Sequence, residues 1–74
     1  MRITVKLFAT LRENREKIFE MEIQEGDTPY EVIQAIGINH EEVAILMING
    51  RGVEMNASLA DQDVLALFPA VGGG

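Results

Sequence analysis

The first residues of the chain alternate between apolar and polar side chains. In residues 2–8, Ile3, Val5 and Leu7 fall on one side, while the residues between them are charged or polar. A repeat of two predicts a strand with one buried face. Phe8 is the exception, because it falls on the polar side. An aromatic ring there indicates an edge contact or a surface for a partner.

A second alternating segment follows a polar connection at residues 9–16, in which we expect one helical turn. Phe19, Met21 and Ile23 then point to one side, with glutamates and a glutamine on the other. Two alternating segments joined by a polar connection are typical of paired strands. We therefore expect residues 1–24 to form an antiparallel hairpin with a long loop.

One short helix is predicted after the hairpin. Thr28 can cap it, Pro29 loses no hydrogen bond at the first helical position, and Glu31 completes a capping box. Gly37 provides the stop. The apolar side chains of this helix share one face, and they are Val32, Ile33 and Ile36. Because so short a helix is not stable alone, we expect it to pack on the sheet.

The second half of the chain predicts further strands. Residues 43–48 are an unbroken apolar run, which indicates a strand inside the sheet. Asn49-Gly50 is a strong hairpin signal, so a short return strand is expected around residues 53–55. Residues 58–61 have the pattern of one capped helical turn, and a polar turn follows them.

The last strand is predicted at residues 64–68. It is wholly apolar, with Leu65 and Leu67 on one face and Val64, Ala66 and Phe68 on the other. Placing it beside the first strand in the centre of the sheet buries the most apolar surface. The fold class is then α+β, a β-grasp (ubiquitin-like) fold with a mixed four- to five-stranded sheet and one main helix packed across it.

Composition limits the class of protein. The chain has 74 residues, which is the size of one domain, and it has no cysteine. A disulfide scaffold and a cysteine nucleophile are thus excluded on this chain. The formal net charge of −6 argues against a nucleic-acid partner. Because no secretory signal and no membrane-length apolar run is visible, we expect no membrane association and a cytoplasmic location.

Side chains inside the predicted domain do not suggest catalysis. His40 is flanked by Glu41 and Glu42, but three adjacent residues in a turn do not converge on one metal ion, which needs about three or four ligands. We therefore expect no metal site and no intrinsic catalytic residue. Ser58 and a single histidine do not make a plausible triad, and the glycines lack the lysine and helix of a phosphate loop.

The end of the sequence is the remaining candidate. We expect a β-grasp domain at residues 1–68 and a flexible C-terminal tail at residues 69–74, which ends in Gly72, Gly73 and Gly74. Glycine passes where any side chain would be blocked. Our hypothesis is that the carboxylate at the tip enters the active site of a partner and is activated there. The alternative is a frayed terminus.

Several segments carry a family resemblance that covers essentially the whole chain. They are residues 5–13, residues 48–50, residues 61–63 and the ending from Leu67. In them the chain resembles small sulfur-carrier proteins of the MoaD/ThiS type, namely the small subunit of molybdopterin synthase and the thiamine-pathway carrier. The most specific segment is the ending, a diglycine after an apolar strand and Phe68-Pro69.

This resemblance implies a function for Gly74. A separate adenylyltransferase of the ubiquitin-activating type adenylates the Gly74 carboxylate with ATP, and sulfide from a persulfide donor then replaces AMP to give a thiocarboxylate. The large subunit of molybdopterin synthase, or thiazole synthase, uses that sulfur to make molybdopterin or thiamine. The chain itself is then not an enzyme, and it binds no cofactor.

The resemblance also implies which residues meet the partner. Aromatic residues matching Phe8 and Phe68 face the partner in the molybdopterin branch, and Pro69 and Val71 lie beside them in sequence. Core packing is the alternative for Phe68. These aromatics favour the molybdopterin branch, while the short connection at residues 37–43 is closer to the thiamine branch.

Two other functions remain open on the sequence. One is a ubiquitin-like modifier, which is joined through Gly74 to lysines of target proteins. The other is a non-catalytic β-grasp interaction module with an idle tail. The first shares the activation chemistry of a sulfur carrier, so the sequence does not separate the two.

Overall fold

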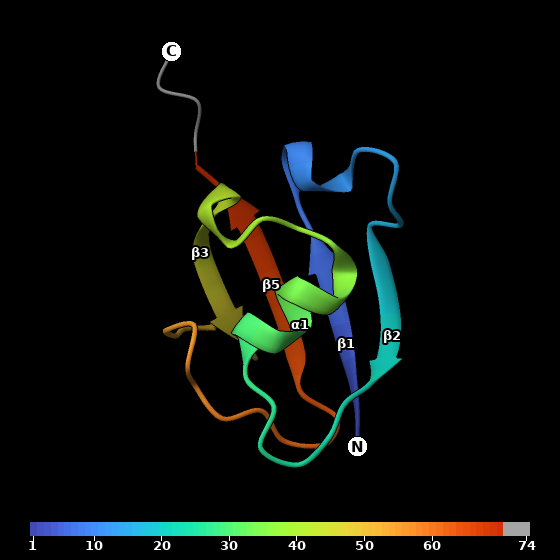
Figure 1. Ribbon diagram of the computed structural model, residues 1–74, viewed down its shortest axis with the longest axis vertical. Coiled ribbons are helices and arrows are strands. Elements are labelled where there is room, and N and C mark those ends of the chain that lie inside the picture. The colour runs from blue at the N-terminus through green and yellow to red at the C-terminus, as the bar shows by residue number, and fades with distance from the viewer. Residues whose placement is uncertain (71–74) are drawn as a thin grey trace.

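A five-stranded mixed sheet with one α-helix across one face forms the protein (Figure 1). The structure is a computed structural model that describes residues 1–70 of the chain. In chain order the elements are β1 (Arg2–Leu7), the 3-10 helix η1 (Ala9–Arg12), β2 (Ile18–Glu22), α1 (Pro29–Ile36), the 3-10 helix η2 (His40–Glu42), β3 (Val43–Ile48), β4 (Arg51–Gly52) and β5 (Val64–Pro69).

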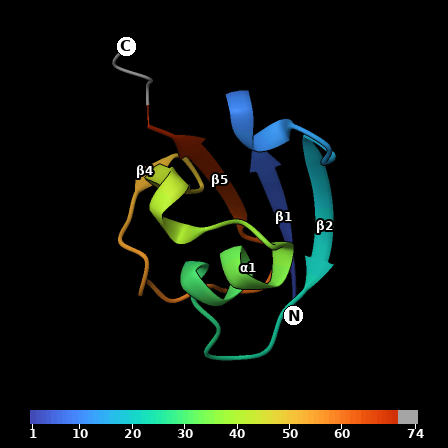
Figure 2. The same ribbon diagram turned by 45° about the horizontal axis from the view of Figure 1, so that its top comes forward.

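The strand order across the sheet is β2-β1-β5-β3-β4. β1 pairs antiparallel with β2 and parallel with β5, whereas β3 pairs antiparallel with both β5 and β4. The predicted hairpin of β1 and β2 is confirmed, and so is the central place of the last strand, β5, beside β1. The β-grasp fold is confirmed as well. Figure 2 shows α1 lying across the sheet on one side only.

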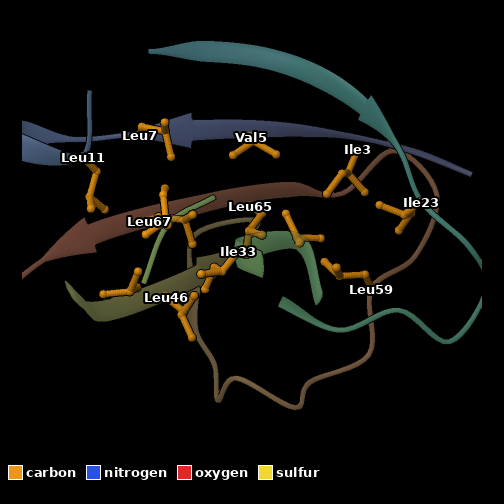
Figure 3. Packing of buried hydrophobic residues seen from close by; sticks show 13 residues of the cluster. Ile3, Val5, Leu7, Leu11, Ile23, Ile33, Leu46, Leu59, Leu65 and Leu67 are labelled. Atoms are coloured by element: carbon orange, nitrogen blue, oxygen red, sulfur yellow. The ribbon is translucent and has the colours of Figure 1, made fainter. Parts of the chain in front are cut away.

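The core lies between α1 and the sheet. Its central side chains come from alternate positions of β1 and β5, which point to the helix face (Figure 3). Val5, Leu65 and Leu67 are completely buried, and so is Ile33 of α1. The expected inward faces are therefore confirmed. Full burial of one such side chain stabilises the fold by about 1.5–3 kcal/mol.

Two further core residues come from connections rather than from strands or α1. Leu11 of η1 is 1% exposed, and Leu59 of the loop before β5 is 5% exposed. Each is the single leucine of its connection, so it has no periodic pattern that would reveal it. Both close the ends of the helix-covered face (Figure 3).

Helix α1 begins and ends where the sequence predicts. The Glu31 carboxylate accepts hydrogen bonds from the backbone N–H and the hydroxyl of Thr28, which is the reciprocal bond of a capping box. These bonds lower the pKa of Glu31 from its ordinary value of 4.5. At the other end, Gly37 adopts φ 87°, a left-handed conformation that favours glycine.

The return strand is shorter and earlier than predicted. Asn49 and Gly50 both have positive φ, at 53° and 84°, as in the two-residue turns whose twist matches paired strands. Pairing therefore resumes at once, with Arg51 opposite Ile48. The expected strand at residues 53–55 is wrong, because a two-residue turn places the return strand directly after Gly50.

The loop before β5 has no helical turn at residues 58–61, contrary to expectation. Its hydrogen bonds go to other partners, since Ala60 donates its N–H to Asp63 Oδ2 at 2.8 Å and Gln62 donates its N–H to Arg2 O at 2.7 Å. The loop is thereby tied to β1 and to its own turn. β5 then runs one residue further than expected, to Pro69.

Strand β3 lies inside the sheet but is not buried on both faces. Val43 and Leu46 are buried, whereas Ile45 is 48% exposed. An unbroken apolar run predicts burial on both sides, but here a single helix covers only one side. Within residues 1–70, no helix is both long enough and apolar enough to cross a membrane.

Candidate functional site

Two aromatic rings stack on the sheet face that α1 leaves open. Leu7 and Leu67 are paired in parallel register, so the next residues, Phe8 and Phe68, come level with each other. Phe8 donates its N–H to Leu67 O at 3.2 Å. The ring centroids are 4.3 Å apart with 11° between the planes. Such a stacked pair stabilises by about 0.5–1.5 kcal/mol beyond its buried area.

A hollow of about 350 Å³ lies beside these rings. It is lined mainly by apolar side chains, and the lining residues are Phe8, Ala9, Thr10, Ile45, Phe68, Pro69 and Ala70. We call these seven residues the docking face. Ile45 of β3 belongs to it because Ile45 is opposite Phe68 in the sheet register. The register shift between Val43 and Ile45 leaves Ala44 as an extra residue beside this pair.

The bend that follows β1 holds Phe8 in place. Ala9 has φ 53°, a left-handed conformation that costs an alanine roughly 1–2 kcal/mol. The chain then turns back through η1, so that the Arg12 guanidinium lies 5.5 Å from the centroid of the Phe8 ring. Arg12 Nε also donates to Leu7 O at 2.9 Å. Strained backbone of this kind is concentrated at functional sites.

The structure brings together three of the sequence-predicted site residues. Phe8, Phe68 and Pro69 line one hollow although the first is 60 positions before the second. Phe68 is on the open face and not in the helix-side core, so core packing does not account for it. The predicted sites Val71, Gly72, Gly73 and Gly74 lie outside the described residues.

Sequence analysis did not predict Ala9, Thr10, Ile45 and Ala70 of the docking face, or Arg12 beside it, as partner-binding residues. Ile45 is hidden in an unbroken apolar run, where nothing tells one face from the other. Arg12 stands in the segment at residues 5–13 that resembles the family, but its contact with Phe8 requires the bend at Ala9. A three-dimensional arrangement of this kind leaves no periodic signal.

His40 does not line the docking face. It is exposed at the start of η2, with its ring centroid 5.4 Å from that of Tyr30. Across residues 1–70, no group of three histidine, aspartate or glutamate side chains is placed to hold a metal ion.

Comparison with known proteins places the chain in a family. A model of the ThiS family matches residues 5–74, which is nearly the whole sequence. The chain belongs to the ThiS family. Members of the ThiS/MoaD group are small non-catalytic sulfur carriers. No curated protein matches this ThiS-family chain.

Solved structures share its fold. A proposed molybdopterin converting factor subunit 1 from Pyrococcus furiosus is 29% identical, with 96% of this chain and 99% of that chain covered and a TM-score of 0.75. A complex of subunits 1 and 2 of the molybdopterin-converting factor from Helicobacter pylori gives 25% identity, full coverage of both chains and a TM-score of 0.68.

A third similar structure is the small archaeal modifier protein 1 of H. volcanii. It is 22% identical, with 95% of this ThiS-family chain and 98% of that chain covered and a TM-score of 0.76. At this identity the likeness concerns the fold alone. All three structures share the β-grasp architecture, which agrees with the strand order and the single covering helix of this chain.

Proposed function

We propose that this protein is a sulfur carrier whose Gly74 carboxylate becomes a thiocarboxylate. A carboxylate oxygen attacks the α-phosphate of ATP on a separate adenylyltransferase, which forms an acyl-adenylate and releases pyrophosphate. Sulfide, set free from a persulfide donor by a thiol, then attacks the acyl carbon and releases AMP. The carrier binds no cofactor in this scheme, because ATP is bound by the activating enzyme.

The observation that carries this proposal is the docking face beside the last described residues. Pro69 and Ala70 line the same hollow as Phe8 and Phe68, so a protein that covers this face meets the chain just before Val71. Only four residues follow Ala70 in the sequence, and a fully extended chain spans at most ~3.3–3.6 Å per residue. The reacting centre of a partner must therefore be near the docking face.

We propose two kinds of partner for this face. The first is an adenylyltransferase of the ubiquitin-activating type, and the second is the large subunit that consumes the sulfur. The H. pylori complex of subunits 1 and 2 supports the second partner. The similarity to the P. furiosus protein, together with the paired aromatics, favours molybdopterin synthase over thiazole synthase.

Intact mass measurement tests the carrier role. The full chain is incubated with ATP, the purified activating enzyme of the host and a sulfide source. We expect a mass gain equal to the replacement of one oxygen by sulfur. The matched control lacks Gly73 and Gly74 but keeps every described residue, and it should show no gain. An unchanged mass for the full chain with an active enzyme would refute the proposal.

Lysine conjugation is the alternative outcome of the same activation. The fold is shared with a small archaeal modifier protein, but a fold does not select between the acceptors of an activated carboxylate. Mass spectrometry of the tagged protein purified from lysates of its host distinguishes the carrier from the modifier. Covalent adducts on target lysines, without thiocarboxylate, would replace the carrier with a modifier. Neither product, and no functional loss on removing Gly73 and Gly74, would indicate an interaction module.

A further inference from the structure

Basic residues gather beside the docking face although the chain is acidic. The sequence has twelve acidic residues and only six Lys or Arg residues, of which four lie between positions 6 and 17. Lys6, Arg12 and Lys17 line one cavity of about 240 Å³, together with Leu7, Phe8 and Ile18. We call the three basic side chains the cationic notch.

The backbone of one buried residue positions the notch. Leu7 is 1% exposed; its N–H donates to Lys17 O at 2.8 Å, and its carbonyl accepts from Arg12 Nε at 2.9 Å. Lys6 precedes it in β1 and is paired with Ile18 across the sheet. The end of β1 therefore positions all three cations: Lys6 lies on the strand, and Arg12 of η1 and Lys17 of the next connection are hydrogen-bonded to Leu7.

Acidic side chains of the described region do not neutralise the notch. The ion pairs formed within residues 1–70 join Arg2 to Glu20 and to Glu22, both at 3.5 Å. Glu20 is the acid nearest to Lys6 in the strand register, two pairs beyond Ile18, but it binds Arg2. Lys6 is also half-buried. Three cations without an acid repel one another, and a partner's carboxylate would remove that cost.

We propose that the cationic notch receives an aspartate or glutamate side chain of the protein that covers the docking face. Phe8 lines both the notch and the docking-face hollow, so one partner surface reaches both. Ile18, which is 53% exposed, forms an apolar rim. The occupant is thus a carboxylate of the partner with an apolar side chain beside it that contacts Ile18. Binding of this carboxylate in the notch fixes how the partner is oriented on the docking face. This inference rests on the proposed function.

A single carboxylate suits the notch better than a polyanion. Glu20 and Glu22 lie further along β2, on the same sheet face as Lys6, and the formal net charge is −6. An extended phosphate backbone would meet these acids and be repelled. One carboxylate presented by a folded partner avoids them.

Charge reversal with a matched control tests the notch. Lys6→Glu and Lys17→Glu are compared with Arg51→Glu, which makes the same change of charge at the opposite end of the sheet. The readout is the KM and kcat of ATP-dependent adenylation of each full-length variant by the host activating enzyme, after thermal unfolding confirms that each is folded. We expect KM to rise about tenfold or more for each notch variant with kcat unchanged, and less than twofold for Arg51→Glu.

The outcomes separate the notch from the carrier role. If wild type is adenylated and both notch variants match Arg51→Glu, the notch proposal is overturned and the carrier role stands. If wild type is not adenylated by an active enzyme, the proposed function fails and the notch proposal fails with it. If an Asp→Lys or Glu→Lys change in the enzyme restores the KM of the Lys17→Glu variant, that enzyme residue is the carboxylate that binds the notch, and the proposal is supported. Loss of RNA or anionic-vesicle binding in the notch variants, with KM unchanged, would overturn the proposal.

Discussion

The position of Phe8 in the chain decides on which face of the sheet its ring lies. A strand sends successive side chains to opposite faces, so Phe8 joins the open face only because Leu7 is buried under α1. Its ring stacks on Phe68 and contacts the Arg12 guanidinium. Phe8 therefore forms part of the docking face and contributes little to the helix-side core.

Replacing Phe8 tests its role in docking. Phe8→Asp should weaken adenylation by at least tenfold in KM while lowering the free energy of unfolding by only about 1 kcal/mol, the order of one lost aromatic pair. The control is Tyr30→Asp, because Tyr30 is an exposed aromatic on α1, outside the docking face. Steady-state adenylation and urea unfolding measure the two effects. Equal KM for both variants would remove Phe8 from the interface.

Glu31 gives a pH-dependent contribution to stability. Its hydrogen bonds to Thr28 lower its pKa in the folded state. The charged carboxylate therefore stabilises the fold above its ordinary pKa of 4.5, and this stabilisation is lost as pH falls through the lowered folded pKa.

The variant Glu31→Gln should accordingly have a lower thermal midpoint than wild type at pH 7. The difference should shrink as pH is lowered below about 4.5 and should disappear below the folded pKa of Glu31. Thermal unfolding followed by circular dichroism across this range measures it, with Glu54→Gln as an exposed control. A difference that is constant with pH would contradict this explanation.

At the scale of elements, the turn between β3 and β4 is also tied to β5. Asn49 Nδ2 donates to Asp63 Oδ1 at 2.9 Å, and Asn49 Oδ1 accepts from the Val64 N–H at 2.9 Å. The Asn49 N–H donates to Val64 O at 2.9 Å. One residue thus supplies the left-handed turn conformation and fixes where the central strand starts.

Asn49→Ala should lower the free energy of unfolding by about 2–4 kcal/mol. The variant loses two side-chain hydrogen bonds, each contributing about 0.5–1.5 kcal/mol, and places alanine in a left-handed conformation that costs roughly 1–2 kcal/mol. Asn56→Ala, in an exposed turn, is the matched control and should change stability by less than about 0.5 kcal/mol. Urea unfolding provides both values, and similar losses would show that the tie to β5 is unimportant.

The whole molecule has one covered and one open sheet face. Among the described residues, α1 covers only the first of these faces. The apolar hollow and the cationic notch lie on the second. The notch is lined by three cations, whereas the protein as a whole has a formal net charge of −6. In our proposal, the notch and not the net charge selects the partner's carboxylate.

This asymmetry predicts different costs for the two faces. Leu65→Ala on the covered face should lower the free energy of unfolding by about 2–5 kcal/mol, because it leaves a cavity. Ile45→Ala on the open face should cost less than about 1 kcal/mol, since Ile45 is already 48% exposed. It should, however, raise the KM for adenylation. Urea unfolding and kinetics of both variants measure this, and a larger stability loss for Ile45→Ala would contradict the assignment of faces.

Local sequence chemistry made most of the fold predictable. Alternation placed Ile3, Val5 and Leu7 correctly, and the signals at Thr28 and Gly37 set the limits of α1 within one residue. One failure, at residues 58–61, occurred where the loop bonds to a distant strand. Arg2 of β1 donates its N–H to Asp61 Oδ1, and its carbonyl accepts from the Gln62 N–H. Such distant partners leave no local pattern in the sequence.

The sequence by itself determined the order of elements, the buried face of each alternating strand and the aromatic character of Phe8 and Phe68. These depend on intervals of a few residues, which the chain carries directly. Only the tertiary structure decided that Ile45 and Arg12 join Phe8, and that Lys6, Arg12 and Lys17 share one cavity. Those contacts depend on strand register and on the bend at Ala9. Packing of the whole sheet sets both the register and the bend, so neighbours in sequence do not reveal these contacts.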